Sequence, residues 1–368
     1  MTPCFTCPTV LEPLIHKRLN PILIEVDFDF TMDLNQIRDR ITERTKAILV
    51  THFFGIPSNI LEIREIAAGK GIAIIEDCAQ TFCAEVNGLK LGSIGDLAFT
   101  SFQNDKPLSL GGGSILLVNN EELVNRLDTE VAHLQLNSLI EEECAFLSLL
   151  FFYLNTEASN YDKYIEVNEY NSYFKQHSSE RENILSNLDH GTIKNRIRKT
   201  KSNRYNILYK LKPFWNILLK SFRTTDKPQF HALLMNSFSL NLLVRSMDSI
   251  KESNELRIRN GTTYIDNLRS SEKIFTPIRI RNVPYLRYCI VCKNKAFYNT
   301  VKKFLNIKGY EVGNFAWSTS INKLLGVREV YSKCDLLSSN ILNLPSHPYV
   351  NEGNILDICD IINALPDS

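Results

Sequence analysis

The chain has 368 residues, of which 44% are hydrophobic and 23% charged, so it carries enough apolar material for a large buried core. This composition excludes intrinsic disorder, and the formal charge of +1 gives no global electrostatic reason to bind nucleic acid. The longest dense apolar run, residues 145–154, is shorter than the roughly 20 residues that a membrane-spanning helix needs. The first residues, MTPCFTCPTV, lack the pattern of an export signal, so we expect a cytoplasmic location.

Short apolar segments recur through the first 120 residues and predict the strands of a covered, largely parallel sheet. They are residues 22–26, 47–50, 72–75, 97–101 and 114–118. Two helices are expected between them, at residues 34–41 and 60–68, with Asp33 and Asn59 as their N-caps. The pattern is typical of an α/β domain that binds its ligand at the carboxyl ends of the strands.

The alternating pattern is lost from about residue 135 to 227, which we interpret as an insert in a large domain of residues 1–238. A basic tract within it, from Lys194 to Arg223, contains no acidic residue. This tract is either a solvated helical face or a surface that binds phosphates or acidic lipids weakly. Residues 239–268 are predicted to form a bridging helix, and residues 269–368 a small α+β domain.

The nine cysteines favour reduced, mostly buried thiols, because the count is odd and no export signal precedes them. Two pairs, Cys4/Cys7 and Cys289/Cys292, have the spacing of zinc ligands. Both pairs lie in extended apolar stretches without the Gly-rich turns that zinc ribbons use, so we expect no metal site.

Two opposite charges follow neighbouring strands of the predicted sheet. Asp77 ends the apolar segment GIAIIED, and Lys106 follows the next strand in LAFTSFQNDK. A lysine in a partly dry pocket can attack a carbonyl as a neutral amine, and a carboxylate can keep a ring nitrogen protonated. Together these are the groups that pyridoxal phosphate requires, although the spacing alone is also compatible with structural or solvated residues.

Longer motifs surround these two residues. They are HFFGIP at residues 52–57, EDCAQ at 76–80, GSIGD at 92–96 and an SFxxxKxL pattern at 101–108. The chain resembles the DegT/DnrJ/StrS family of sugar aminotransferases in these motifs, and outside the insert the likeness extends over most of its length. The resemblance implies the α/β architecture of pyridoxal-phosphate-dependent transferases of fold type I, with a mostly parallel sheet in the large domain and a small C-terminal α+β domain.

The resemblance also assigns roles by position. Lys106 would form the imine with the cofactor and shuttle protons, and Asp77 would hold the pyridine nitrogen. Gln80 would lie beside the ring hydroxyl, Ala79 would pack under the ring, and Ser101 would bind the phosphate. We interpret His52 as structural.

Lysine at position 106 favours amino transfer, because family members that remove a sugar hydroxyl carry histidine there. The implied function is the transfer of an amino group, from glutamate or another donor, to a nucleotide-linked keto-sugar for surface polysaccharides. The family builds each active site from two subunits, so we expect a homodimer.

Three features depart from the family. Cys7 stands where an aromatic residue usually stacks on the ring, and Gly112-Gly113-Ser114 replaces a Glu-Gly-Gly sequence. The family's phosphate-binding helix N-terminus would lie upstream of Met1, so we expect weak cofactor binding by this chain and an N-terminal extension in any fully active form. The alternative is a catalytically silent or truncated relative that acts as a partner subunit or as a nucleotide-sugar binding module.

Overall fold

The computed structural model describes residues 1–103, 105–131, 235, 237–269, 272, 274–275, 280–313 and 320–365. Contacts divide the chain into two units, Met1–His133 with Ser239–Ser368, and Leu134–Phe238. Nearly all described residues belong to the first unit, and the fold is given for that unit alone. The predicted insert at 135–227 and its basic tract lie outside the described residues.

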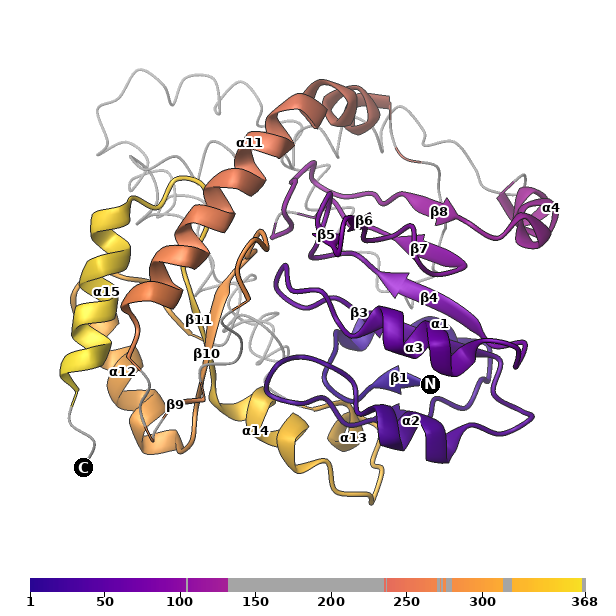
Figure 1. The fold of residues 1–368 in the computed structure, drawn as a ribbon, viewed down its shortest axis with the longest axis horizontal. Helices are drawn as coiled ribbons and strands as arrows, with labels where there is room; N and C mark the ends of the chain where they lie inside the picture. Colours follow the sequence, from indigo (N-terminus) through magenta and orange to yellow (C-terminus); the bar gives the residue numbers. More distant parts are fainter. Residues whose placement is uncertain are drawn as a thin grey trace, which may run out of the picture. The chain divides into compact units, whose positions relative to one another are not determined.

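The main sheet contains the strands β3 (Ala47–Thr51), β4 (Ala73–Asp77), β7 (Leu97–Phe99) and β8 (Leu116–Val118), in that order (Figure 1). The first three strands are parallel, and β8 is antiparallel to β7. Thr51 pairs with Asp77, which in turn pairs with Phe99, so three strands end side by side. The predicted sheet is confirmed for these four segments.

The edge strand β8 is less buried than we expected. We predicted that every strand would be covered on both faces, but Leu116 and Leu117 on β8 are exposed. The segment predicted at residues 22–26 is reduced to β2 (Leu23–Ile24), which pairs in parallel with β1 (Thr2–Pro3) in a separate two-stranded sheet.

The two predicted helices are confirmed as α2 (Leu34–Arg40) and α3 (Ile60–Ala67). The Asp33 carboxylate caps α2 by accepting hydrogen bonds from the N–H groups of Asn35 and Gln36. Asn59 is the N-cap residue of α3, as predicted, but its side chain makes no capping hydrogen bond and is bonded to the backbone of Met32 instead. The remaining short elements of this half are η1 (Pro8–Val10), α1 (Glu12–His16), β5 (Glu85–Val86), β6 (Leu89–Lys90) and α4 (Glu121–Val131).

The C-terminal part has the predicted α+β character. It begins with the long helix α11 (Ser237–Asn267) and contains a three-stranded antiparallel sheet in the order β11-β10-β9 (Figure 1). The strands are β9 (Ile274–Phe275), β10 (Tyr288–Cys292) and β11 (Ile341–Leu344), and the helices are α12 (Lys295–Ile307), α13 (Ile321–Leu324), α14 (Ser332–Asn340) and α15 (Glu352–Ala364). The domain boundaries at 238 and 268 stay predictions. No helix among the described residues is long and apolar enough to cross a bilayer.

A single hydrophobic cluster joins the N-terminal segment to the C-terminal sheet. Phe5, Phe30 and Phe53 belong to the same buried cluster as residues of β10 and β11. At Gly55 the backbone has a φ of +93°, and a Cβ there would lie 2.2 Å from the carbonyl oxygen of Pro284. The loop after β3 therefore packs directly on the chain that leads into β10, and glycine is required at this contact.

One cysteine expectation is overturned. Cys4 is joined by a disulfide to Cys334, with 6.2 Å between their Cα atoms, so these two residues are not free thiols. The sequence paired Cys4 only with Cys7, by their spacing. The true partner could not be predicted, because two cysteines 330 positions apart form no local pattern. The other described cysteines are free.

Candidate active site

The last residue of β4 places a carboxylate in the interior. The Asp77 side chain accepts hydrogen bonds from the Ala79 N–H at 3.0 Å and from the Thr51 hydroxyl at 3.4 Å. Burial raises the pKa of Asp77, while these bonds and the charges of His52 and Lys106 act against the rise. The carboxylate thus lacks a direct cationic partner among the described residues, and a bound cationic N–H would compensate its burial.

A line of hydroxyl groups leads from this carboxylate to the N-terminal segment. Thr51 reaches Asp77, and its hydroxyl lies 3.4 Å from that of Thr6. Cys7 follows directly, and its Sγ lies 2.9 Å from the Thr9 hydroxyl. The structure therefore brings the Cys7 segment to the Asp77 end of the sheet. Thr6 and Thr51 were missed from the sequence, because a threonine in a strand usually indicates only β propensity.

Lys106 lies on a loop whose two ends are joined by backbone hydrogen bonds. Phe102 donates its N–H to the carbonyl of Gly113 at 3.0 Å, and Leu110 donates to that of Phe102 at 2.9 Å. The Lys106 side chain is 14% exposed, and its Nζ lies 3.3 Å from Asp105 Oδ2. Its charge also acts on Asp77. The structure thus brings together the two charged residues that the sequence predicted at one end of the sheet.

The remaining predicted site residues are Ala79, Gln80 and Ser101. Ala79 is half-buried, two residues after Asp77. Gln80 is buried, and its Oε1 accepts the N–H of Phe54 at 2.8 Å, which fixes the loop after β3. Ser101 is half-buried beyond the end of β7, and its hydroxyl has no hydrogen-bond partner among the described residues. It is therefore available to a ligand.

A second carboxylate in the same motif is structural. Glu76 accepts hydrogen bonds from the N–H groups of Gly92, Ile94 and Gly95 at 2.6–2.8 Å, and lies 3.2 Å from His52 Nε2. His52 Nδ1 accepts the N–H of Ser58, so the imidazole is engaged on both sides. This agrees with the structural role predicted for His52.

Two arginines of the C-terminal part, the buried Arg257 and the half-buried Arg287, were not indicated by the sequence. Arg257 on α11 donates to the carbonyl oxygens of Tyr285 and Leu286. Burial lowers the pKa of Arg287, and the charge of Asp105, beside Lys106, opposes this shift. The C-terminal part therefore contributes positive charge close to the lysine loop.

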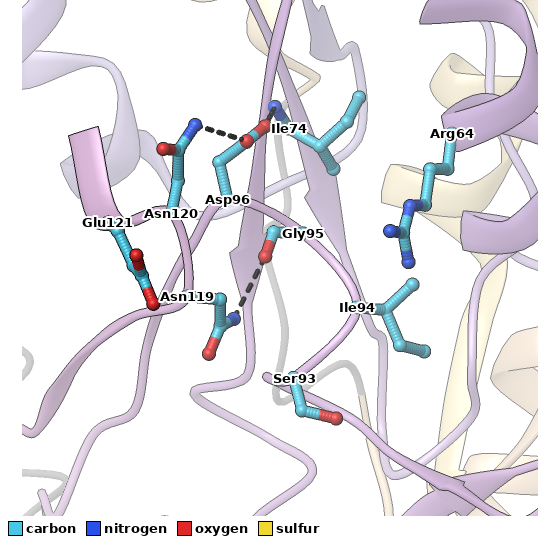
Figure 2. A pocket seen from close by; sticks show the side chains of 9 residues that line it. All are labelled: Arg64, Ile74, Ser93, Ile94, Gly95, Asp96, Asn119, Asn120 and Glu121. Carbon is cyan, nitrogen blue, oxygen red and sulfur yellow. Dashed lines mark hydrogen bonds between the residues drawn. The ribbon is translucent and has the colours of Figure 1, made fainter. Parts of the chain in front are cut away.

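A pocket of about 380 Å³ lies elsewhere, where β4 and β7 begin (Figure 2). Figure 2 shows the Asp96 carboxylate bonded to the Ile74 N–H, and Asn119 bonded to Gly95. These bonds satisfy the polar groups of the loops around the pocket. Since ligands of such sheets bind at the carboxyl ends of the strands, the candidate site is the Asp77 end.

Comparison with known proteins shows what the chain is similar to. Residues 1–137 match the DegT/DnrJ/EryC1/StrS aminotransferase family. This part of the chain is therefore similar to that family. A UDP-N-acetyl-3-dehydro-alpha-D-glucosamine 3-aminotransferase from Acidithiobacillus ferrooxidans is 35% identical over 129 residues, which cover 34% of this chain and 35% of the relative. A dTDP-3-amino-3,6-dideoxy-alpha-D-galactopyranose transaminase from Aneurinibacillus thermoaerophilus is 36% identical over 150 residues, covering 37% of this chain and 41% of the relative. The matches thus span less than half the length of these curated relatives.

The similarity in fold extends beyond that stretch. A solved structure of the Escherichia coli GDP-4-keto-6-deoxy-D-mannose-3-dehydratase with bound hydrated PLP matches with a TM-score of 0.66 at 16% identity, over 98% of this chain and 78% of that one. The predicted fold class, that of fold type I pyridoxal-phosphate enzymes, is confirmed.

Pyridoxal phosphate is the cofactor expected for this family, and the residues present fit it. A buried carboxylate without a direct cationic partner suits a protonated ring nitrogen, and the mostly buried Lys106 lies close enough for its charge to act on that carboxylate. The Ser101 hydroxyl is available for a phosphate oxygen.

Proposed function

We propose that this protein is a pyridoxal-phosphate-dependent aminotransferase that transfers an amino group from glutamate to a nucleotide-linked keto-sugar. The observation that carries the proposal is the placement of the buried Asp77 at the end of β4, with the half-buried Lys106 on the loop that follows the neighbouring strand β7. The sugar class comes from the names of the relatives, which act on UDP- and dTDP-linked sugars. We infer that the product enters surface polysaccharide precursors, in the cytoplasm.

In our proposal Lys106 and Asp77 carry out the chemistry of amino transfer. When bound, the cofactor supplies a carbonyl that condenses with amines and a pyridinium ring that withdraws electrons. Lys106 holds the cofactor through Nζ and, once displaced, accepts and returns a proton at that nitrogen. Asp77 accepts a hydrogen bond from the ring N–H and keeps it protonated, and its position is fixed by the Ala79 N–H and the Thr51 hydroxyl.

Other groups position the ligand. Ser101 donates its hydroxyl to the phosphate, and Ala79 supports the ring. Gln80 holds Phe54 in place by accepting its N–H. In our proposal Cys7 lines the ring face without the stacking that an aromatic residue would give.

The nature of residue 106 decides between amino transfer and hydroxyl removal. Lysine can return to the cofactor covalently after each half of the reaction, and histidine cannot form that bond. We therefore propose amino transfer, even though two of the similar solved structures are dehydratases.

A half-reaction tests the proposal. Protein loaded with pyridoxal phosphate should show the visible absorption of lysine-bound cofactor. Glutamate should then convert it to the near-ultraviolet absorption of the pyridoxamine form, and a nucleotide-linked keto-sugar should restore the visible band. Lys106→Ala should remove the visible band, whereas Lys90→Ala, at an exposed lysine of β6, should retain it.

The outcomes separate the alternatives. A protein that binds a nucleotide-sugar but neither binds cofactor nor reacts with glutamate would be a silent partner subunit or binding module. A cofactor band that glutamate leaves unchanged would contradict the proposed donor.

A further inference from the structure

Three potential metal ligands from distant parts of the chain meet in the interior. Cys4 follows β1, Glu25 follows β2, and Cys334 is the third residue of α14. Their relative exposures are 0%, 9% and 0%, and their ligand atoms lie within 4.8 Å of one another. The site joins the N-terminal segment to the C-terminal part.

The carboxylate in this group has few hydrogen-bond donors. Glu25 Oε1 accepts the N–H of Cys334 at 2.9 Å and lies 3.8 Å from Cys4 Sγ. Among the described residues, no other backbone N–H donates to this carboxylate, and the nearby Lys333 is paired with Asp27 instead. The charge of Glu25 is therefore incompletely compensated, as expected where a cation can bind.

The other buried group of similar composition behaves differently. His52, Glu76 and Cys78 also lie close together, but Glu76 already accepts three backbone N–H groups and the imidazole is bonded on both sides. A metal ion there would have to displace satisfied hydrogen bonds. The comparison singles out the Cys4, Glu25 and Cys334 group.

The donor chemistry of this group matches zinc. Two thiolates and a carboxylate are ligands that Zn²⁺ accepts, one atom from each residue, and a water molecule would take the fourth tetrahedral position. Two sulfurs on one tetrahedral zinc lie about 3.8 Å apart, given Zn–S bonds of about 2.3 Å. The Cα separation of 6.2 Å allows the sulfurs to bond to each other, and rotation of the side chains would part them for an ion.

We propose that Cys4, Cys334 and Glu25 bind one zinc ion when the chain is reduced, so that the same two sulfurs form either a disulfide or a metal site. A dithiol reductant breaks the S–S bond by exchange, supplies two electrons and two protons, and is itself oxidised to a disulfide. Zinc then binds the two thiolates, and the thiol protons pass to solvent. In both states the N-terminal segment stays attached to α14.

Cobalt is the probe for this site, because its thiolate complexes absorb visibly and in the near ultraviolet. The full chain, reduced with a dithiol and freed of excess reagent, is titrated with Co²⁺ alone. We expect one Co²⁺ per chain with a sulfur-to-metal charge-transfer band that Zn²⁺ abolishes by displacement. The chain oxidised to the disulfide should show no such band.

Variants assign the ligands. Cys4→Ser and Cys334→Ser should each lose most of the charge-transfer band. Glu25→Gln retains an acceptor for the Cys334 N–H, so it should fold and bind Co²⁺ at least 10-fold more weakly. Cys359→Ser, at a free cysteine on α15 that is as buried as Cys334, is the matched control and should bind normally.

The proposal is overturned if reduced wild-type protein with native circular dichroism gives no charge-transfer band. It is equally overturned if the band persists in Glu25→Gln with unchanged affinity and in both serine variants. None of these readouts involves pyridoxal phosphate, so they are independent of the proposed aminotransferase function.

Discussion

The last residue of β4, Asp77, has a raised pKa because burial outweighs the groups that favour its charged form. These groups are the Ala79 N–H, the charges of His52 and Lys106 and the Thr51 hydroxyl. A cationic ring N–H placed against Asp77 would reverse that shift. Asparagine at this position would retain the shape and the bond from Ala79 but could not stabilise the protonated ring.

We therefore predict that Asp77→Asn still binds cofactor through Lys106 but transfers amino groups about 100- to 1000-fold more slowly. The measurement is the rate of the glutamate half-reaction, with the visible band as a check on binding. Turnover equal to that of the wild type would show that Asp77 has only a structural role.

The neighbouring carboxylate gives a stability prediction. Burial alone would raise the pKa of Glu76, but the bonds from His52, Gly95 and Gly92 lower it below its usual value. Glutamine would leave at least one buried N–H unpaired, so Glu76→Gln should lower the free energy of unfolding by about 2–4 kcal/mol. Glu85→Gln, at an exposed position of β5, should have little effect.

Glu76 also makes the free energy of unfolding depend on pH. A carboxylate with a lowered pKa in the folded state stabilises the fold above its unfolded pKa of about 4.3, and this stabilisation is lost as the pH falls through the folded value. Urea unfolding should thus show the largest difference between wild type and Glu76→Gln near pH 7. A difference that grows below pH 4 would contradict this account.

At the scale of elements, α11 approaches the chain before β10 at a glycine. A Cβ on Gly261 would lie 2.2 Å from the Tyr285 ring, whereas one on Gly353 of α15 would meet no atom closer than 3.4 Å. In an open helix, glycine-to-alanine substitution gains up to about 1 kcal/mol. At Gly261 the steric cost of about 1–3 kcal/mol exceeds that gain.

We predict that Gly261→Ala lowers the free energy of unfolding, while Gly353→Ala leaves it unchanged or raises it slightly. Both values come from urea unfolding of the full chain. Stabilisation by Gly261→Ala would mean that α11 does not pack on Tyr285.

The elements also show what the sequence could predict. Apolar runs bounded by polar residues indicated β3, β4 and β7, and hence that Asp77 and the Lys106 loop share one end of a sheet. The exposure of β8 was not predictable, because Leu116 and Leu117 have the same apolar pattern as buried strand residues. The Thr51 bond to Asp77 and the charge of Arg287 near Asp105 depend on tertiary packing, which leaves no local pattern.

At the scale of the whole molecule, residues far apart in sequence share one core. The disulfide between Cys4 and Cys334 and the bond from Leu286 N–H to the Phe54 carbonyl both connect the two ends of the chain. The motifs around the proposed site lie in the N-terminal part, so sequence reasoning could propose the site but not the C-terminal groups packed near it.

We also predict a homodimer. Leu240, Val244 and Met247 are exposed at helical spacing on α11, and an apolar stripe of this kind is typical of an interface. Light scattering at micromolar concentration should give twice the chain mass of 42.2 kDa. A mass of one chain would contradict the prediction, and replacing Val244 with Asp should shift a dimer towards that mass.

The covalent bond between Lys106 and the cofactor is the central claim, and borohydride reduction tests it most directly. Reduction of the protein in the presence of pyridoxal phosphate fixes the cofactor on whichever lysine holds it, and mass spectrometry of the peptides identifies that lysine. The account predicts one cofactor per chain on the peptide that contains Lys106, and none in Lys106→Ala. Labelling of a different lysine, or no labelling at saturating cofactor, would contradict it.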